Sequence, residues 1–164
     1  MCLPVTTSLL DELSPQARQA RRHALVERML RDVLEVPWSK VHREAEKWGD
    51  DVSDEVEARI AVMLGDPGTC PHGNPIPGSA NVPDQRDAVR LVDCPAGPAE
   101  VVRITEELED DDEAMQLLDA AGVTPGRDIE VRRRHDDGSV DLAGGDSDLT
   151  VPGRAAMRLY VRRR

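Results

Sequence analysis

Apolar side chains recur every three to four residues between positions 14 and 65, which is the spacing of amphipathic helices. Ser14 followed by Pro15 predicts the start of a first helix, because serine caps free amides and proline fits the first turn. Pro37 predicts its end. A short second helix is predicted over about residues 39–48. Along the first helix the arginines fall largely opposite the apolar stripe: Arg18, Arg21, Arg22, Arg28 and Arg31.

A third helix is predicted after Ser53, whose hydroxyl is placed to cap it, and Gly65 predicts its end. Acidic residues in its first turn suit the positive end of the helix dipole. Its apolar positions form one stripe: Val56, Ile60 and Leu64.

Residues 66–85 are rich in proline and glycine, which predicts a linker or an extended loop. Beyond them the pattern changes to short alternating runs, typical of strands, at residues 88–92, 100–104, 128–132, 139–142 and 157–161. An acidic run at 106–113 leads into one helix that Gly122 ends. The sequence therefore predicts an α+β protein, with an all-helical part first and a small β-barrel second.

Amino-acid composition narrows the classes of function that the sequence allows. The formal charge of −11 over 164 residues argues against binding to a phosphate backbone. The near absence of aromatic residues, with no phenylalanine, one tyrosine and two tryptophans, argues against base stacking. The basic clusters at 132–134 and 162–164 are interpreted as solvated strand faces or as partners of the acidic residues. Three cysteines without paired spacing, at positions 2, 70 and 94, favour a reduced, cytoplasmic protein. No apolar run is long enough for a signal peptide or a membrane span, so no membrane partner is expected.

The candidate chemistry lies in two His-x-x-x-Glu pairs, His23 with Glu27 and His42 with Glu46. Residues four apart on a helix lie about 40° apart around its axis, so each pair points an imidazole and a carboxylate in one direction. Each pair is half of a transition-metal site. The alternative is a surface ion pair or a solvated stripe.

Other motifs are weaker. Cys70 and His72 could be half of a zinc site, but they lack two further donors, and a rigid loop is the alternative. His135 beside an Asp-Asp-Gly run suits a hairpin turn. No glycine-rich phosphate loop follows a strand and no nucleophile stands at a base's spacing, so the sequence does not predict an enzyme.

Three segments together resemble a known family: the helix at residues 22–30, the run at 40–48, and residues 53–57 followed by the His-Gly-Asn-Pro-Ile-Pro loop at 72–77. They resemble the diphtheria toxin repressor family of iron- and manganese-dependent regulators. The resemblance implies a metal-binding and dimerisation domain over 1–78, a linker at 79–87 and a FeoA-like, SH3-type barrel over 88–164.

The same resemblance implies two metal sites. Its ancillary site falls on His23, Glu27 and His42, and the barrel could add Asp110 and Glu113. The alternative for these two carboxylates is simple stabilisation of a helix N-terminus.

In the primary site, Glu46 matches a ligand position, whereas the next ligand positions carry Gly49 and Asp50. We expect this second site to be degenerate and empty unless Asp50 or Asp51 takes part.

The family resemblance also implies a homodimer that binds Fe(II) or Mn(II), with Zn, Co or Ni accepted in vitro, and then DNA through a winged helix-turn-helix. Residues 1–13 are too few for that reader, so DNA binding requires a winged-helix domain upstream. A natural sensor without a reader, a misassigned start and a truncated chain all stay open.

The helix stripe of Val56, Ile60 and Leu64 is the candidate dimer face, and packing within the subunit is its alternative. The alternative function is an adaptor or protein-binding module with a vestigial metal site and no DNA binding.

Overall fold

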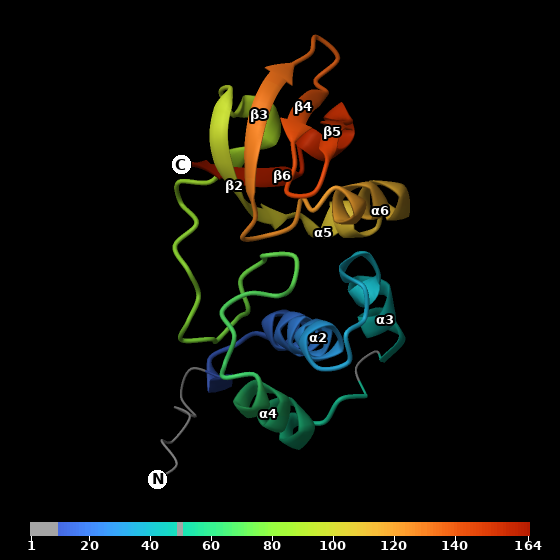
Figure 1. Cartoon of the computed structure of the whole chain (residues 1–164). Helices are drawn as coiled ribbons and strands as arrows, with labels where there is room; N and C mark the ends of the chain where they lie inside the picture. Colours follow the sequence, from blue (N-terminus) through green and yellow to red (C-terminus); the bar gives the residue numbers. More distant parts are fainter. Residues whose placement is uncertain (1–9, 49–50) are drawn as a thin grey trace. The chain divides into compact units, whose positions relative to one another are not determined.

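The computed structural model describes residues 10–48 and 51–164, and its contacts form two compact units. The helical unit comprises the chain up to Pro71 together with Pro75–Pro83. The sheet unit comprises Asp84–Arg164 together with the short segment His72–Asn74. Colour in Figure 1 follows the chain through both units. The predicted domain limits, 1–78 and 88–164, assign His72–Asn74 to the helical part and stay a prediction.

The helical unit includes the helices α2 (Pro15–Asp32), η1 (Trp38–Lys40, a 3-10 turn), α3 (Val41–Trp48) and α4 (Asp54–Met63). The hydroxyl of Ser14 accepts a hydrogen bond from the Ala17 amide at 3.2 Å, and that of Ser53 accepts one from Val56 at 3.3 Å, as serine caps do. The first helix ends at Asp32, before Pro37, because Val33 already forms its C-cap.

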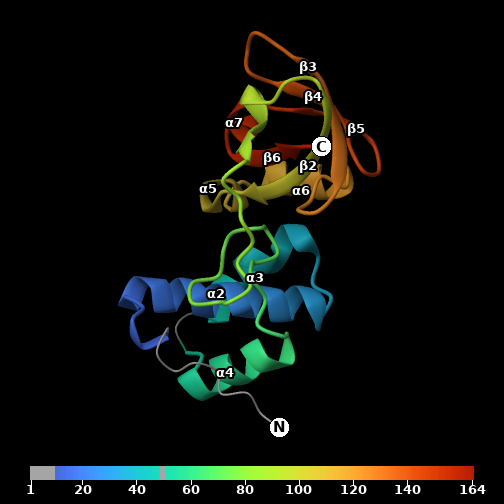
Figure 2. The same cartoon turned by 90° about the vertical axis from the view of Figure 1, so that its left-hand side faces the viewer.

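The core of the helical unit lies where α2 packs against both α3 and α4 (Figure 2). It comprises Ala24, Leu25, Val26, Leu30, Val41, Ala45, Val52, Ile60, Ala61, Cys70 and Ile76. Ile60 is 4% exposed and Leu64 packs against the same cluster, so these two residues pack within the subunit. The predicted dimer face is therefore wrong for Ile60, whereas at the partly buried Leu64 it stays a prediction. The exposed apolar side chains of α4 are instead Val56, Val62 and Met63.

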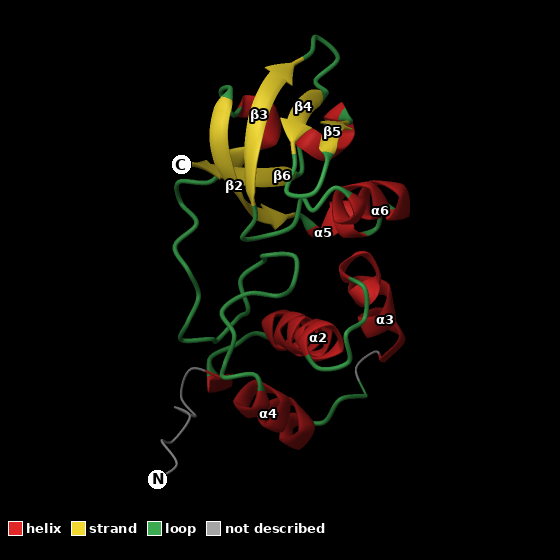
Figure 3. Ribbon diagram, viewed as in Figure 1, coloured by secondary structure: helices red, strands yellow, loops and turns green. Residues whose placement is uncertain are grey.

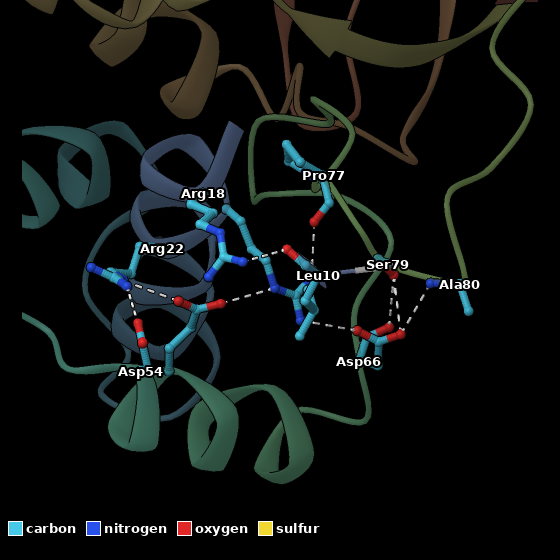
Figure 4. Close-up of polar contacts among 10 residues, drawn as sticks. Leu10, Arg18, Arg22, Asp54, Asp66, Pro77, Ser79 and Ala80 are labelled. Carbon is cyan, nitrogen blue, oxygen red and sulfur yellow. Dashed lines mark hydrogen bonds and ion pairs between the residues drawn. The ribbon is translucent and has the colours of Figure 1, made fainter. Parts of the chain in front are cut away.

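Arg21 departs from the predicted polar face, because it is buried at 3% exposure. Its Nε donates to Glu57 Oε1 at 3.0 Å and its Nη1 donates to the Pro77 carbonyl at 3.0 Å. Arg22 donates to the other oxygen of Glu57 at 3.0 Å and also bonds Asp54. Figure 4 shows these contacts joining α2, α4 and the proline-rich loop. A buried arginine is tolerated here because its charge is paired and its N–H groups are bonded.

The sheet unit holds a six-stranded antiparallel SH3-like sheet (Figure 3). Its strands are β1 (Val89–Arg90), β2 (Gly97–Ile104), β3 (Asp128–Arg134), β4 (Val140–Ala143), β5 (Asp148–Val151) and β6 (Leu159–Arg163), in the spatial order β1-β6-β2-β3-β4-β5. Four short helices complete the unit: η2 (Leu91–Asp93), α5 (Glu106–Glu109), α6 (Asp112–Ala120) and α7 (Gly153–Ala156). The α+β class, helices first, is confirmed.

Some predicted elements have other limits in the structure. The strand expected at 88–92 keeps only Val89 and Arg90, since Leu91 turns inward to full burial and the Cys94 amide donates to its carbonyl at 3.0 Å. The one helix expected after the acidic run is two helices, because the Asp111 side chain caps a new start at the Ala114 amide, 3.1 Å away. Among the described residues, no helix is long and apolar enough to cross a membrane.

Candidate metal centre

The two histidines and the glutamate of the predicted ancillary site come from neighbouring helices. His23 and Glu27 lie one turn apart on α2, and His42 is the second residue of α3. Buried Val41 and Ala45 fix α3 against α2 within the helical core. This packing, which one helix alone cannot supply, brings His42 to the first pair.

The donor atoms of these three residues meet at one point. His23 Nε2 lies 3.1 Å from Glu27 Oε1 and 3.1 Å from His42 Nδ1, and His42 Nδ1 lies 2.8 Å from the same Glu27 oxygen. The imidazole rings meet edge to face, with centroids 4.8 Å apart and planes at 68°. The predicted grouping of His23, Glu27 and His42 thus has a common focus in the structure.

Burial differs across the three side chains. Glu27 is 1% exposed, whereas the side chains of His23 and His42 are 31% and 14% exposed. A carboxylate buried this deeply needs a cation or hydrogen-bond donors to offset its lost hydration. Two imidazoles can donate N–H groups to it, and a metal ion can replace those protons because ligating nitrogens must be unprotonated.

The spacing fits a divalent transition metal. Bonds of about 2.1 Å at right angles place neighbouring donor atoms about 3.0 Å apart. The three observed separations, 2.8 to 3.1 Å, agree with that value. Two nitrogens and one carboxylate oxygen on a single face suit Fe(II), Mn(II), Co(II), Ni(II) or Zn(II), and they leave further coordination positions for other ligands.

Of the residues matched to ligand positions of the primary site, the structure describes Glu46. Its carboxylate is exposed and lies 3.8 Å from His42 Nε2, the imidazole nitrogen that does not face Glu27. A carboxylate behind the second nitrogen of a ligating histidine can orient the ring. Gly49 and Asp50 lie outside the described residues, so the degenerate primary site stays a prediction.

Asp110 and Glu113 belong to the sheet unit. Asp110 caps the end of α5 and Glu113 lies in the first turn of α6, and both are exposed. An Arg154 nitrogen, Nη2, lies 3.3 Å from Glu113 Oε2, while Arg154 Nε donates to Asp111 at 2.9 Å. These contacts raise the pKa of the Arg154 guanidinium, chiefly through Asp111. The assignment of Asp110 and Glu113 as ligands stays a prediction.

Cys70 and His72 are both buried. Cys70 packs in the helical core, and His72, fully buried in the sheet unit, has Nδ1 3.2 Å from Glu109 Oε2. Asn74 Nδ2 donates to the other oxygen of Glu109 at 2.9 Å. Sequence reasoning missed Glu109, because nothing in the acidic run marks one carboxylate as buried.

Two family models together match most of the chain. The model described as iron dependent repressor, metal binding and dimerisation domain matches residues 17–78, and the FeoA domain model matches residues 89–163. A solved manganese-dependent transcriptional repressor is 30% identical, with a TM-score of 0.77 over 96% of this chain and 88% of its own. The chain belongs to the iron-dependent repressor family.

The predicted family resemblance is thereby confirmed. Within the iron-dependent repressor family, the iron-dependent repressor IdeR of Mycobacterium tuberculosis is 36% identical over 151 residues, or 86% of this chain. The chain spans 66% of the length of that relative. A manganese-dependent transcriptional repressor solved in complex with manganese is 29% identical, with a TM-score of 0.74 over 88% of this chain and 69% of its own. Members of the iron-dependent repressor family are named as regulators and not as enzymes.

Proposed function

We propose that this chain is the metal-sensing and dimerisation part of a metal-dependent transcriptional regulator of the cytoplasm. It takes one Fe(II) or Mn(II) through His23, Glu27 and His42. The observation that carries the proposal is the meeting of three donor atoms 2.8 to 3.1 Å apart around a buried carboxylate. The names of the relatives, iron- and manganese-dependent repressors, support the choice of metal.

Asp110 and Glu113 complete the proposed coordination set. Fe(II) and Mn(II) accept carboxylate oxygens as ligands, and both carboxylates are exposed at the junction of α5 and α6. Arg154 contacts both Glu113 and its neighbour Asp111, so in this proposal Glu113 exchanges one cation for another on binding. Glu46 acts behind His42 in this proposal, and any metal at Glu46 and Asp50 is bound weakly.

The proposed partner is a second copy of the chain. The exposed apolar side chains on α4, Val56, Val62 and Met63, are 44%, 69% and 55% exposed, and burial between two copies would remove them from water. DNA binding belongs to the proposal only for a chain that carries a winged helix-turn-helix ahead of α2.

A thermal-melt series tests the metal site. At about a hundred times the dissociation constant, bound Mn(II) adds about 2.7 kcal/mol to the free energy of unfolding. For a chain of this size that raises the melting midpoint by about 5–10 °C. We expect this shift for the native chain and its loss in His23→Ala.

His135→Ala is the matched control, because His135 pairs with Asp141 in the sheet unit and takes no part in the proposed site. It should retain the full Mn(II) shift. A native chain that shows no shift with Mn(II), Fe(II) or Zn(II) would contradict the proposed function and favour the adaptor alternative.

A further inference from the structure

The distances between donor atoms on α2 and α3 are those of one coordination geometry in particular. His42 Nδ1 lies 3.1 Å from His23 Nε2 and 2.8 Å from Glu27 Oε1. Donors that meet a metal at right angles, as in six-coordination, lie about 3.0 Å apart, whereas the wider angle of tetrahedral Zn(II) requires about 3.4 Å. Both separations between the helices therefore suit a six-coordinate ion and are short for a tetrahedral one.

A site that can adapt its spacing would not keep this distinction. Zn(II) ordinarily binds nitrogen and oxygen donors more tightly than Mn(II) or Fe(II) does, so a flexible site binds Zn(II) in preference. Donors that are held in place by hydrogen-bonded neighbours cannot move apart without breaking those bonds. Selectivity for Mn(II) or Fe(II) thus requires a structure that resists the separation of α2 from α3.

The segment Thr69–Pro71 of the helical unit is hydrogen-bonded to both of these parts. Arg28, the neighbour of the proposed glutamate ligand on α2, donates from Nε to the Thr69 carbonyl at 2.7 Å and from Nη2 to the Thr69 hydroxyl at 3.2 Å. Trp38 Nε1 donates to the Pro71 carbonyl at 2.8 Å in a buried contact. We call Arg28, Trp38 and Thr69–Pro71 the clamp.

The clamp is anchored at its middle and lies close to the proposed ligands. Cys70, between the two bonded carbonyls, packs in the helical core at 4% exposure. Trp38 is also 4% exposed, and its turn η1 leads directly into α3, where His42 follows four residues later. A movement of α3 away from α2 would have to break the Trp38 bond or the Arg28 bonds, or pull Cys70 out of the core.

We propose that the clamp determines metal selectivity: it resists the separation of α2 and α3, keeps the donors at six-coordinate spacing and so disfavours tetrahedral Zn(II). This inference rests on the function proposed above. Arg28 and Trp38 bind no metal in this role. They are positioning residues that act through Glu27 and His42.

The test compares the Mn(II) and Zn(II) affinities of the full chain by isothermal titration calorimetry. Trp38→Phe removes the indole N–H and keeps an aromatic ring, and Arg28→Met removes both bonds to Thr69 and keeps the aliphatic stem. Loss of groups that orient ligands weakens metal binding about 10-fold or more, and we expect about that loss for Mn(II) in each variant. Zn(II) affinity should stay within about twofold of its native value, so the ratio of the two affinities moves toward Zn(II).

Visible spectra of bound Co(II) provide a second readout, because four-coordinate Co(II) absorbs much more strongly than six-coordinate Co(II). We expect the weak spectrum for the native chain and a stronger one for Trp38→Phe. A side chain that only stabilises the fold would change the melting midpoint and leave the spectrum of the bound ion as it is.

Matched controls make the same chemical changes at exposed positions of the same two helices. Trp48→Phe alters an indole at the end of α3 that is 40% exposed, and Arg31→Met removes a 3.4 Å contact between α2 and the Val36 carbonyl. Both should bind Mn(II) and Zn(II) within about twofold of the native chain, since neither residue takes part in the clamp.

Metal-free melts establish which variants are folded, and Arg28→Met, at a side chain that is 26% exposed, provides the test if Trp38→Phe does not fold. Equal losses of Mn(II) and Zn(II) affinity overturn the inference. So do native affinities for both ions in a folded variant, and either outcome leaves the proposed function standing. A native chain that binds neither ion overturns both.

Discussion

Glu27 sits between two imidazoles at 1% exposure, where an unpaired carboxylate would be costly. Its position explains why a surface ion pair, the plain alternative for a His-x-x-x-Glu pair, does not describe this site. A surface pair contributes little and leaves both groups hydrated. Here one oxygen is shared by His23 and His42, so a single glutamate organises both histidines.

A second single-residue feature concerns acid stability. Asp141 in β4 accepts hydrogen bonds from the Thr150 hydroxyl at 2.7 Å and from His135 at 2.9 Å. The Thr150 bond, followed by the His135 bond, lowers the pKa of the Asp141 carboxyl below its ordinary value of 3.8. Because the folded pKa is depressed, this stabilisation is present above pH 3.8 and is lost as the pH falls through the folded value.

The prediction is that Thr150→Val raises the pKa of Asp141 toward 3.8, since the larger of its two hydrogen bonds is removed without a change in shape. Carboxyl chemical shifts followed by NMR titration measure the change. Asp137, whose pKa is lowered mainly by Ser139, is the internal reference and should titrate as in the native chain. An unmoved Asp141 would show that Thr150 is not the cause.

At the scale of elements, strong local signals were predictable. Ser14 and Ser53 mark helix starts in the sequence, and the structure confirms both caps. The helix α7 escaped prediction, because four residues are too few for a helical period, and the strand β5 escaped it as well. Leu91 lies in a 3-10 helix and not in the predicted strand, and there its side chain is fully buried. Tertiary packing determines this conformation, and local propensity does not.

For the candidate site too, the local pattern predicted some of the residues and not others. Spacing alone predicted that His23 and Glu27 share a face of α2, whereas the addition of His42 required the family resemblance. The bonds from Trp38 to Pro71 and from Asn74 to Glu109 join residues 33 and 35 positions apart. Such contacts depend on the completed fold, so no local pattern announces them.

Arg21 gives a prediction at this scale, because it ties α2 to α4 and to the proline-rich loop. Removing one partner of a buried ion pair leaves an uncompensated group and costs about 3–5 kcal/mol. Arg22 still pairs with Glu57 in Arg21→Ala, so we expect the lower end, about 3 kcal/mol. Urea unfolding measures the loss.

Arg18→Ala is the control, since that side chain is 41% exposed and lies 3.7 Å from an exposed Asp11. It should lower the free energy of unfolding by less than about 1 kcal/mol. Equal losses in the two variants would show that burial of Arg21 contributes nothing beyond an ordinary surface pair.

At the scale of the whole molecule, many acidic side chains form ion pairs with arginines of the same chain. Basic residues of the two arginine clusters pair within the sheet unit: Arg132 with Asp148, Arg162 with Asp87 and Arg164 with Asp128. This agrees with the interpretation of those clusters as internal partners of acidic residues. The net charge of −11 keeps copies apart at long range, so association of two copies must come from apolar contact.

The proposed dimer is tested by placing a charge on α4. Val62 is 69% exposed and outside the helical core, so Val62→Asp should leave the fold intact while weakening self-association at least about tenfold, the effect of burying an unpaired charge. Sedimentation velocity measures the dissociation constant. Leu117→Asp, at a 37% exposed apolar position on α6 in the sheet unit, should associate as the native chain does. Unchanged association in Val62→Asp would exclude Val62 from the contact between copies.

The excursion of His72–Asn74 into the sheet unit also decides how the protein can be divided. A recombinant fragment that starts at Asp84 lacks the carbonyl that Ile104 binds and both side chains that contact Glu109. A protease cut between Ser79 and Val82 has the opposite consequence. The amino-terminal piece then carries the tripeptide, so the contacts that His72–Asn74 makes within the sheet unit join residues of both pieces.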